Sequence, residues 1–274
     1  MAKSYGFCFG VKRAIKIAES AGEAATIGEL IHNAEEINRL KQNFGVKTLE
    51  GVSEITDEQK LIIRTHGIQK DDLQRLKAQN KELIDATCPF VTKPQQIVEK
   101  MSAEGYDIVI FGDKNHPEVK GVKSYAKSRV FVIMDTKELQ DVKLGSRVAL
   151  VSQTTKKIES FTKIADFLMQ RARELRIFNT ICNATLENQE AVKSLSQKAD
   201  VMIIVGGKNS SNTKQLFLIS QNFCKDSYLI ENENELERSW FENKSLCGIS
   251  AGASTPDWII KKVVARIENL TRNL

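Results

Sequence analysis

Asp85–Glu118, which reads DATCPFVTKPQQIVEKMSAEGYDIVIFGDKNHPE, is repeated without a gap 94 residues further on, where position 85 becomes 179 and the copy ends at Asn212. In this alignment Cys88 matches Cys182 and His116 is opposite Ser210. Further identical pairs include Gln95/Gln189, Val98/Val192, Ser102/Ser196, Gly112/Gly206, Lys114/Lys208 and Asn115/Asn209. A third, looser copy opens the chain, where Cys8 begins the unit and His32 lies four residues after Gly28. Repetition at a fixed period indicates one supersecondary unit used several times. The sequence therefore predicts three units, 10–88, 89–181, and 182–274 together with 1–9.

Helical and strand patterns alternate within each unit. The apolar spacing predicts helices over 11–23, 35–41, 71–79 and 95–103, and strands over 24–30, 60–65, 107–111, 147–151, 201–205 and 246–249. Strands that alternate with helices indicate an α/β fold with parallel sheets. Polar residues that follow such strands mark the edge at which ligands bind.

Composition excludes several classes of protein. The chain has 274 residues, and its 40 basic and 35 acidic side chains give a net charge of only +5, with no dense basic run, so nucleic acid is not an expected partner. No stretch approaches the roughly 18 apolar residues of a membrane span, and the first residues, MAKSYGFCFG, do not resemble a signal peptide. We expect a cytoplasmic protein. Five widely spaced cysteines in a reducing compartment favour ligand or catalytic roles over disulfides.

Three of the cysteines, Cys8, Cys88 and Cys182, occupy the same place in each repeat. A pseudo-threefold arrangement of the units brings three thiolates to one axis, where they suit zinc with one open position or an iron-sulfur cluster with one iron left for substrate. The spacing does not choose between these two. Cys224, expected on a helical segment, and Cys247, expected in an apolar strand, have no motif around them and are interpreted as packing residues.

All three histidines of the chain, His32, His66 and His116, follow predicted strands. No zinc-type spacing such as HxxxH is present, so the histidines do not indicate a metal site of their own. Imidazole and hydroxyl donors at turns that enter helices suit a phosphate group, because they add to the backbone N–H groups there. Further donors are supplied by Ser210, Ser211, Asn212 and Ser254, although helix capping alone also explains Ser210 and Ser254.

Glu118 is a carboxylate at the end of the repeated turn, two residues after His116, and the equivalent residue of the other copy is Asn212, which is not acidic. Burial near negative charge raises the pKa of a carboxyl group and makes it a proton donor at neutral pH. The alternative is an acid in the first turn of a helix, where the dipole favours it. Thr154 and Thr155 are candidates for capping the helix that follows them.

Nine motifs in order from Gly6 to Trp258 together resemble the 4-hydroxy-3-methylbut-2-enyl diphosphate reductase family, called IspH or LytB. They are GFCFGVKRA, IHN, RTHG, DATCPFV, NHPEVKG, VSQTT, ICNAT, GGKNSSNT and SAGASTPDW. The resemblance implies three α/β units in a trefoil around a 4Fe-4S cluster. It also implies the last step of the methylerythritol phosphate route to isoprenoids, in which a reductase gives isopentenyl and dimethylallyl diphosphate.

Carried over by motif, Cys8, Cys88 and Cys182 are the cluster ligands and Glu118 relays protons, with Thr154 near the substrate hydroxyl. The resemblance also implies that the diphosphate of the substrate is bound by His32, His66, His116, Ser210, Ser211, Asn212 and Ser254. Flavodoxin or ferredoxin is the electron donor that the resemblance implies. Two departures from the family pattern are Asn188, where many relatives carry Arg, and Lys156-Lys157, where Leu-Ser is usual.

Two other functions remain possible from the residues alone. A non-catalytic iron-sulfur or zinc sensor of a phosphorylated metabolite leaves Glu118 and Thr154 without a chemical task, so it predicts ligand binding without turnover. A zinc-dependent phosphohydrolase is separated from both by metal analysis.

Overall fold

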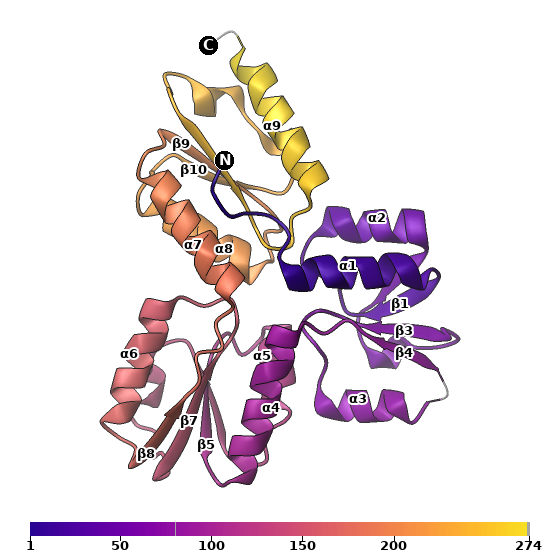
Figure 1. Ribbon diagram of the computed structural model, residues 1–274, viewed down its shortest axis with the longest axis vertical. Helices are drawn as coiled ribbons and strands as arrows, with labels where there is room; N and C mark the ends of the chain where they lie inside the picture. Colours follow the sequence, from indigo (N-terminus) through magenta and orange to yellow (C-terminus); the bar gives the residue numbers. More distant parts are fainter. Residues whose placement is uncertain (80, 273–274) are drawn as a thin grey trace. The chain divides into compact units, whose positions relative to one another are not determined.

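The computed structural model describes residues 1–79 and 81–272, and these residues form three parallel β-sheets flanked by helices (Figure 1). The chain divides into two compact units, each of which makes most of its residue contacts internally. Unit 1 comprises Met1–Lys12, Ile31–Arg39 and Asn183–Leu274, and unit 2 comprises Arg13–Leu30 and Leu40–Cys182. The expected α/β class with parallel sheets is confirmed.

The first sheet of unit 2 has the order β2-β1-β3-β4, all parallel. Its strands are β1 (Ala24–Ile27), β2 (Val46–Leu49), β3 (Lys60–Ile63) and β4 (Glu82–Asp85). Helix α3 (Lys70–Lys77) lies on one face, and α1 (Phe9–Ala21) and α2 (Ala34–Phe44) lie on the other (Figure 1).

The second sheet of unit 2 has the order β6-β5-β7-β8, again parallel. Its strands are β5 (Asp107–Phe111), β6 (Val130–Ile133), β7 (Arg147–Ser152) and β8 (Glu174–Ile177). One face packs on α4 (Pro89–Ala103) and α5 (Pro117–Lys123), and α6 (Ile158–Met169) lies on the opposite side (Figure 1).

Unit 1 is built on the sheet β10-β9-β11, formed by β9 (Val201–Val205), β10 (Ser227–Ile230) and β11 (Cys247–Ala251). Residues on one face of the sheet pack against α9 (Asp257–Thr271), and those on the other pack against α7 (Asn183–Ser196) and α8 (Ser211–Gln221). The N-terminal segment runs beside β11, because the amides of Ala2 and Gly6 donate to the carbonyls of Ile249 and Ala251. Short 3₁₀ turns complete the description at Val52–Glu54, Thr136–Leu139, Glu233–Glu235 and Arg238–Phe241.

The inner strands form because they are continuous apolar runs, which suits strands covered by helices on both faces. Every residue of β5 and β9 is buried. None of the helices within the described ranges has both the length and the apolar character needed to cross a membrane.

Three features of the fold differ from expectation. The strands β2, β4, β6, β8 and β10 were not predicted. All five are partly exposed, and β2, β4 and β8 also lack a continuous apolar run, whereas β6 is the short apolar stretch VFVI. Helices α1 and α4 begin earlier than expected, directly after Cys8 and Cys88. The prediction of Cys224 on a helix is wrong, since α8 ends at Gln221 and Cys224 lies in the turn that follows.

Candidate active site

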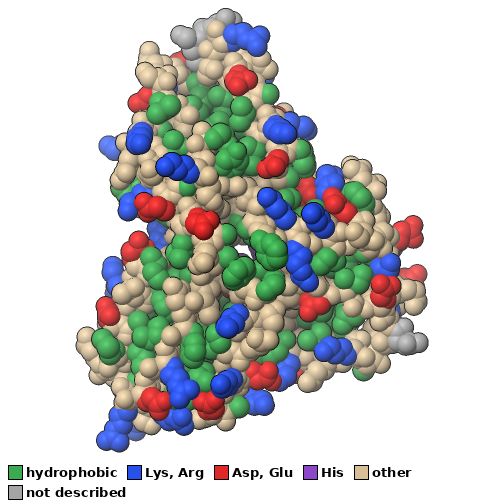
Figure 2. Space-filling model, viewed as in Figure 1, with side chains coloured by type: hydrophobic (Ala, Val, Ile, Leu, Met, Phe, Trp, Pro, Cys, Tyr) green, Lys and Arg blue, Asp and Glu red, His purple; other side chains and the backbone are tan. Residues whose placement is uncertain are grey.

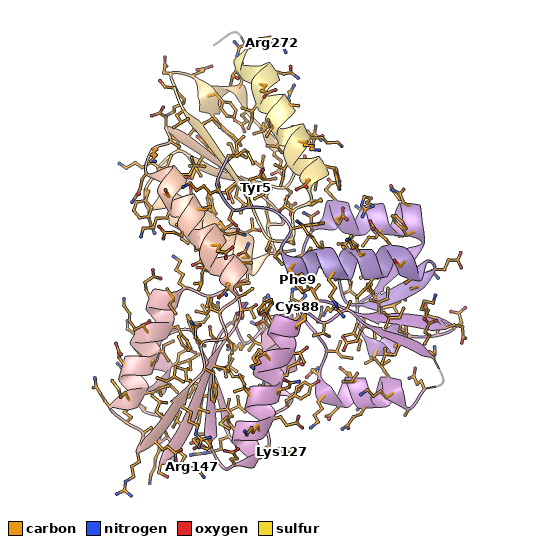
Figure 3. All side chains as sticks on the ribbon, viewed as in Figure 1. Tyr5, Phe9, Cys88, Lys127, Arg147 and Arg272 are labelled. Atoms are coloured by element: carbon orange, nitrogen blue, oxygen red, sulfur yellow. The ribbon has the colours of Figure 1, made fainter. Side chains whose placement is uncertain are left out.

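The three repeat cysteines have the same local setting. Each lies immediately before a helix, and Figure 3 shows Cys88 at the start of α4. Each backbone amide donates to a carbonyl two residues beyond the end of a strand, and the bonds are Cys88 to Thr65 (3.0 Å), Cys182 to Thr154 (3.0 Å) and Cys8 to Ala253 (3.2 Å). All three residues are partly buried. Because the amino end of a helix stabilises negative charge, these are positions that favour thiolates.

The other two cysteines have different surroundings. Cys224 is 5% exposed and packs among apolar residues of α7, α8, β9 and β10. Cys247 is the first residue of β11, where burial raises its thiol pKa to about 11. A thiol that stays protonated at neutral pH is a poor metal ligand. Packing roles for this pair agree with their surroundings.

Glu118 and Thr154 form a closed pair in unit 2. The Thr154 amide donates to Oε1 of Glu118 and the Thr154 hydroxyl donates to Oε2, both over 2.7 Å. Glu118 is 2% exposed, and its burial raises the pKa of the carboxyl group even though the two bonds from Thr154 and the charge of Lys156 oppose the rise. A buried carboxyl group with a raised pKa holds a proton that it can transfer. Neither Thr154 nor Thr155 caps α6, which begins at Ile158.

His116 is the residue before α5, and its ring fixes the start of that helix. Nδ1 of His116 accepts the backbone N–H of Glu118 over 3.2 Å, and Pro117 is the first helical residue, as expected. With Nδ1 as acceptor, the proton of a neutral ring is on Nε2. The His66 ring lies edge-on to the His116 ring, with centroids 5.5 Å apart. Unit 2 therefore brings two imidazoles together beside the turn that carries Glu118.

The turn after β5 is tied to the turn after β7. The Gln153 side chain accepts the Asp113 amide over 3.0 Å and donates to the Thr155 hydroxyl over 3.1 Å. A Cβ at Gly112 would lie 2.7 Å from Val119 Cγ2 and 3.1 Å from Gln153 Cβ, so only glycine allows this approach. Gln153 was not assigned a role from the sequence, although VSQTT includes it.

In unit 1 the equivalent turn is followed by α8. Ser210 caps this helix, because its hydroxyl accepts the Thr213 amide over 3.3 Å, so the capping role considered for this residue is present. Ser211 is partly buried. Asn212 is 4% exposed, yet neither its amide nitrogen nor its amide oxygen has a hydrogen-bond partner among the described residues. Buried polar groups are nearly always bonded, so an unsatisfied amide at a helix start fits a site for a polar ligand.

His32 and Ser254 meet beside that turn. The Ser254 hydroxyl donates to the His32 carbonyl over 3.1 Å, and Ser254 does not cap α9. A Cβ on Gly207 would lie 2.4 Å from the same carbonyl oxygen. His32, Gly207 and Ser254 therefore lie together in unit 1, where Gly207 and Ser254 follow the neighbouring strands β9 and β11.

A buried hydrogen-bond network around Glu36, four residues after His32, was not predicted from the sequence. Glu36 is 1% exposed, its amide donates to the Asn33 side chain, and its carboxylate accepts from Arg39 and from Trp258 Nε1. The pairing of Glu36 with Trp258 joins residues more than 200 positions apart. Glu36 matches no motif, and only its acidic character next to IHN marks it.

An open cleft of about 650 Å³ lies elsewhere in unit 2. It is lined by first or second residues of four strands, namely Ala24, Lys47, Lys60 and Glu82, together with charges of both signs. These are the amino ends of the strands. Ligands of parallel sheets bind at the carboxyl ends, so this cleft is not part of the candidate site.

Comparison with known proteins identifies the family. The model of the LytB protein family matches residues 1–268. The chain belongs to the LytB family. It is 75% identical over 270 residues to the 4-hydroxy-3-methylbut-2-enyl diphosphate reductase of Campylobacter hominis, covering 98% of both chains. It is 65% identical over 273 residues to the reductase of Campylobacter jejuni subsp. doylei, covering 100% of this chain and 99% of that one.

Two solved structures of such reductases also match. One, described as the terminal enzyme of the non-mevalonate pathway, is 42% identical with a TM-score of 0.72 and 98% coverage of both chains. The other, from Plasmodium falciparum, is 28% identical with a TM-score of 0.91, covering 97% of this chain and 86% of that one. The family resemblance inferred from the nine motifs is confirmed.

The two departures from the LytB pattern have defined surroundings. Asn188 is 3% exposed and accepts the Ser4 hydroxyl over 2.6 Å. Lys156 is 5% exposed, with Nζ 3.2 Å from Met134 Sδ and 5.9 Å from the centre of the Phe111 ring. Burial lowers the pKa of Lys156, and the carboxylates of Asp113 and Glu118 partly offset the decrease. This LytB protein therefore carries a buried amine close to the Glu118–Thr154 pair.

Proposed function

We propose that this protein reduces 4-hydroxy-3-methylbut-2-enyl diphosphate to isopentenyl and dimethylallyl diphosphate, as the last step of the methylerythritol phosphate pathway. The allylic C–O bond breaks, the hydroxyl leaves as water, and the allyl group takes up two electrons and one proton. A second proton completes the water. The named function of its LytB relatives supports this reaction.

The observation that carries the proposal is the Glu118–Thr154 pair. A protonated Glu118 can donate from Oε2 to the Thr154 oxygen, which turns the Thr154 hydroxyl proton outward to a bound hydroxyl group. The Thr154 amide meanwhile holds Oε1, so the carboxyl group keeps its orientation while the proton moves. Protonation of the leaving oxygen by a positioned acid typically accelerates such a step 10²- to 10⁴-fold.

The diphosphate is assigned to hydrogen-bond donors in both units. In unit 1 these are Ser210, Ser211, Asn212, Ser254 and His32, and the unsatisfied amide of Asn212 supports the assignment. In unit 2 they are His66 and His116, whose rings lie edge-on with centroids 5.5 Å apart. Fixing the diphosphate positions the hydroxyl end of a small, flexible substrate for reaction.

Cys8, Cys88 and Cys182 are assigned as the ligands of a 4Fe-4S cluster. The residues fit this group, because each of the three thiols has the same backbone bond at a helix start and thiolates are the soft ligands that such a cluster needs. When bound, such a cluster supplies electrons singly and offers an iron without a protein ligand as a Lewis acid. Flavodoxin or ferredoxin is the proposed electron donor, and the cytosol is the proposed compartment.

Anaerobic purification tests the assignment. We expect a coloured protein whose reduced form gives an electron paramagnetic resonance signal that changes when the substrate binds. With a chemically reduced viologen dye it should convert the substrate to both products. A colourless protein that holds one zinc and releases phosphate overturns the proposal in favour of a phosphohydrolase. Substrate binding without turnover overturns it in favour of a sensor.

A further inference from the structure

Exposed aromatic and basic side chains follow one another along the N-terminal segment and the first turns of α1. The large apolar side chains are Phe9, which is 64% exposed, and Tyr5, which is 40% exposed. Figure 3 labels both, Tyr5 on the segment and Phe9 at the start of α1. Three exposed lysines accompany them, and we call the set the basic-aromatic surface: Lys3, Tyr5, Phe9, Lys12 and Lys16.

Helical spacing places most of this set on one face of α1. Positions 9, 12 and 16 are three and four residues apart, so their side chains lie in one row. Val11, Ala14, Ile15 and Ala18 form the opposite, buried row. Phe9 therefore faces outward, on the side of α1 opposite its buried apolar row.

The charge around Phe9 is of one sign. Residues 1–18 contain four basic side chains and no acidic one, and Glu19 is the first carboxylate of the chain. Over the whole protein basic and acidic side chains nearly balance, at 40 to 35. Figure 2 shows basic and acidic side chains interspersed over most of the face that it draws, and Lys and Arg side chains gathered over the start of α1. This surface attracts a negatively charged partner.

The segment is preformed for contact. The backbone amides of Ala2, Gly6 and Cys8 donate, in that order, to the carbonyls of Ile249, Ala251 and Ala253, which are every second residue along β11 and just beyond its end. Gly6 adopts a positive φ of 72°, and a Cβ there would lie 3.2 Å from Ile260 Cδ1, so the turn before Cys8 depends on glycine. A surface held in this way loses little conformational freedom when a partner binds.

We propose that an acidic one-electron carrier protein docks on the basic-aromatic surface to reduce the group held by Cys8. An interface with an aromatic centre and a charged rim has the anatomy of a transient protein complex, in which the charges accelerate encounter. Phe9 adjoins Cys8 in the chain, so their Cα atoms are about 3.8 Å apart and a carrier that covers Phe9 is close to the thiol. This inference rests on the proposed function, since it needs a redox group at Cys8.

A charge reversal with two electron donors tests the proposal. The variant Lys12→Glu/Lys16→Glu is compared with the parent holoenzyme, using reduced flavodoxin as the acidic carrier and reduced methyl viologen as a small donor. We expect the KM for flavodoxin to rise at least tenfold and its dependence on salt to weaken. The rate with the dye should stay within twofold of the parent. Phe9→Ala should lower the flavodoxin-driven rate in the same selective way.

The matched control is Lys214→Glu/Lys261→Glu, which makes the same charge change on exposed lysines of α8 and α9. An equal rise in KM for the control, an unchanged KM in Lys12→Glu/Lys16→Glu, or an equal loss with dye and flavodoxin overturns the proposal. Failure of the proposed function is seen separately, as a parent that does not convert the substrate with the dye. If that parent is a coloured sensor without turnover, the rate at which reduced flavodoxin bleaches its colour still measures docking, whereas a colourless parent overturns this inference together with the proposed function.

Discussion

Residues 112–118 and 206–212 form the same turn in two repeats, and they differ at its end. Each turn follows a five-residue buried strand and caps the next helix, through His116 Nδ1 in one and Ser210 Oγ in the other. In the first, both oxygens of Glu118 are bonded to Thr154. In the second, both polar atoms of Asn212 have no partner among the described residues.

This difference separates two tasks. A carboxyl group that the protein itself satisfies is held in place to exchange a proton, and its burial raises its pKa. An amide that the protein leaves unsatisfied is suited to an external partner, and at the start of a helix that partner is an anion. We propose that the repeated turn serves proton transfer in unit 2 and anion binding in unit 1. The variants below are ordered from the largest expected effect to the smallest.

The feature that both repeats share is the cysteine before the first helix. Cys8→Ser, Cys88→Ser and Cys182→Ser should each lose the cluster and all measurable turnover, because three ligands are needed to hold it. Iron analysis and visible absorbance check this. Cys224→Ser and Cys247→Ser are the controls and should keep the cluster, with a loss of about 1–3 kcal/mol in the free energy of unfolding from burying a hydroxyl. If Cys224→Ser were the only variant to lose iron, the assignment of the three repeat cysteines as cluster ligands would be wrong.

Glu118→Gln tests the proton side of the comparison. The amide keeps the size of the side chain but has no ionisable proton, so turnover should fall about 10²-fold or more while substrate affinity changes little. Steady-state rates with the dye, together with the substrate-induced spectral change, separate the two quantities. Glu159→Gln on α6, an exposed site, should match the parent. If Glu118→Gln turns over at the parent rate, Glu118 reverts to a helix-start acid.

Asn212→Ala tests whether the amide of Asn212 binds the anionic part of the substrate. Loss of a hydrogen bond to a charged ligand costs about 1.5–3 kcal/mol, so the Kd for the substrate should rise about 10- to 100-fold. Stability should not fall, because the amide has no internal bond to lose. Calorimetric titration and thermal unfolding measure the two effects, with Asn222→Ala at the exposed end of α8 as the control. A large drop in Tm with unchanged affinity would show a packing role instead.

Gly207→Ala tests the approach of the two turns in unit 1. The new Cβ would lie 2.4 Å from the His32 carbonyl oxygen, so the backbone must shift, at a cost of about 1–3 kcal/mol in the free energy of unfolding. Gly51→Ala is the control, since its φ is −170° and no atom lies within 4 Å of its Cβ. Urea unfolding should show the loss only at Gly207. Equal stability of the two variants would mean that the turns do not meet this closely.

Much of this comparison was predictable from the sequence. The bounds of β5 and β9 match the predicted strands at both ends, because each is a fully buried apolar run between polar turns. His32, His66 and His116 follow β1, β3 and β5 as predicted, and the motifs identified the family. The outer strands were missed, since partial exposure of β4 and β8 removes the apolar run that marks an inner strand.

Contacts between distant residues could not be predicted. The bond between Glu36 and Trp258, the fit of Gly207 against His32 and the buried amine of Lys156 depend on how the chain folds back. The hydrogen bonding of Glu118 and Asn212 also depends on such contacts and could not be predicted. The sequence aligns these residues, but only the structure shows that one is satisfied and the other is not.

The pH dependence of turnover at saturating substrate tests the division of tasks most directly. A general acid must be protonated to act, so the parent rate should be constant at low pH and fall as the pH rises through the raised pKa of Glu118, above the range of an ordinary glutamate. Asn212→Ala should keep this decline at saturation, and Glu118→Gln should lose it along with most of the rate. A decline that persists unchanged in Glu118→Gln would contradict the account.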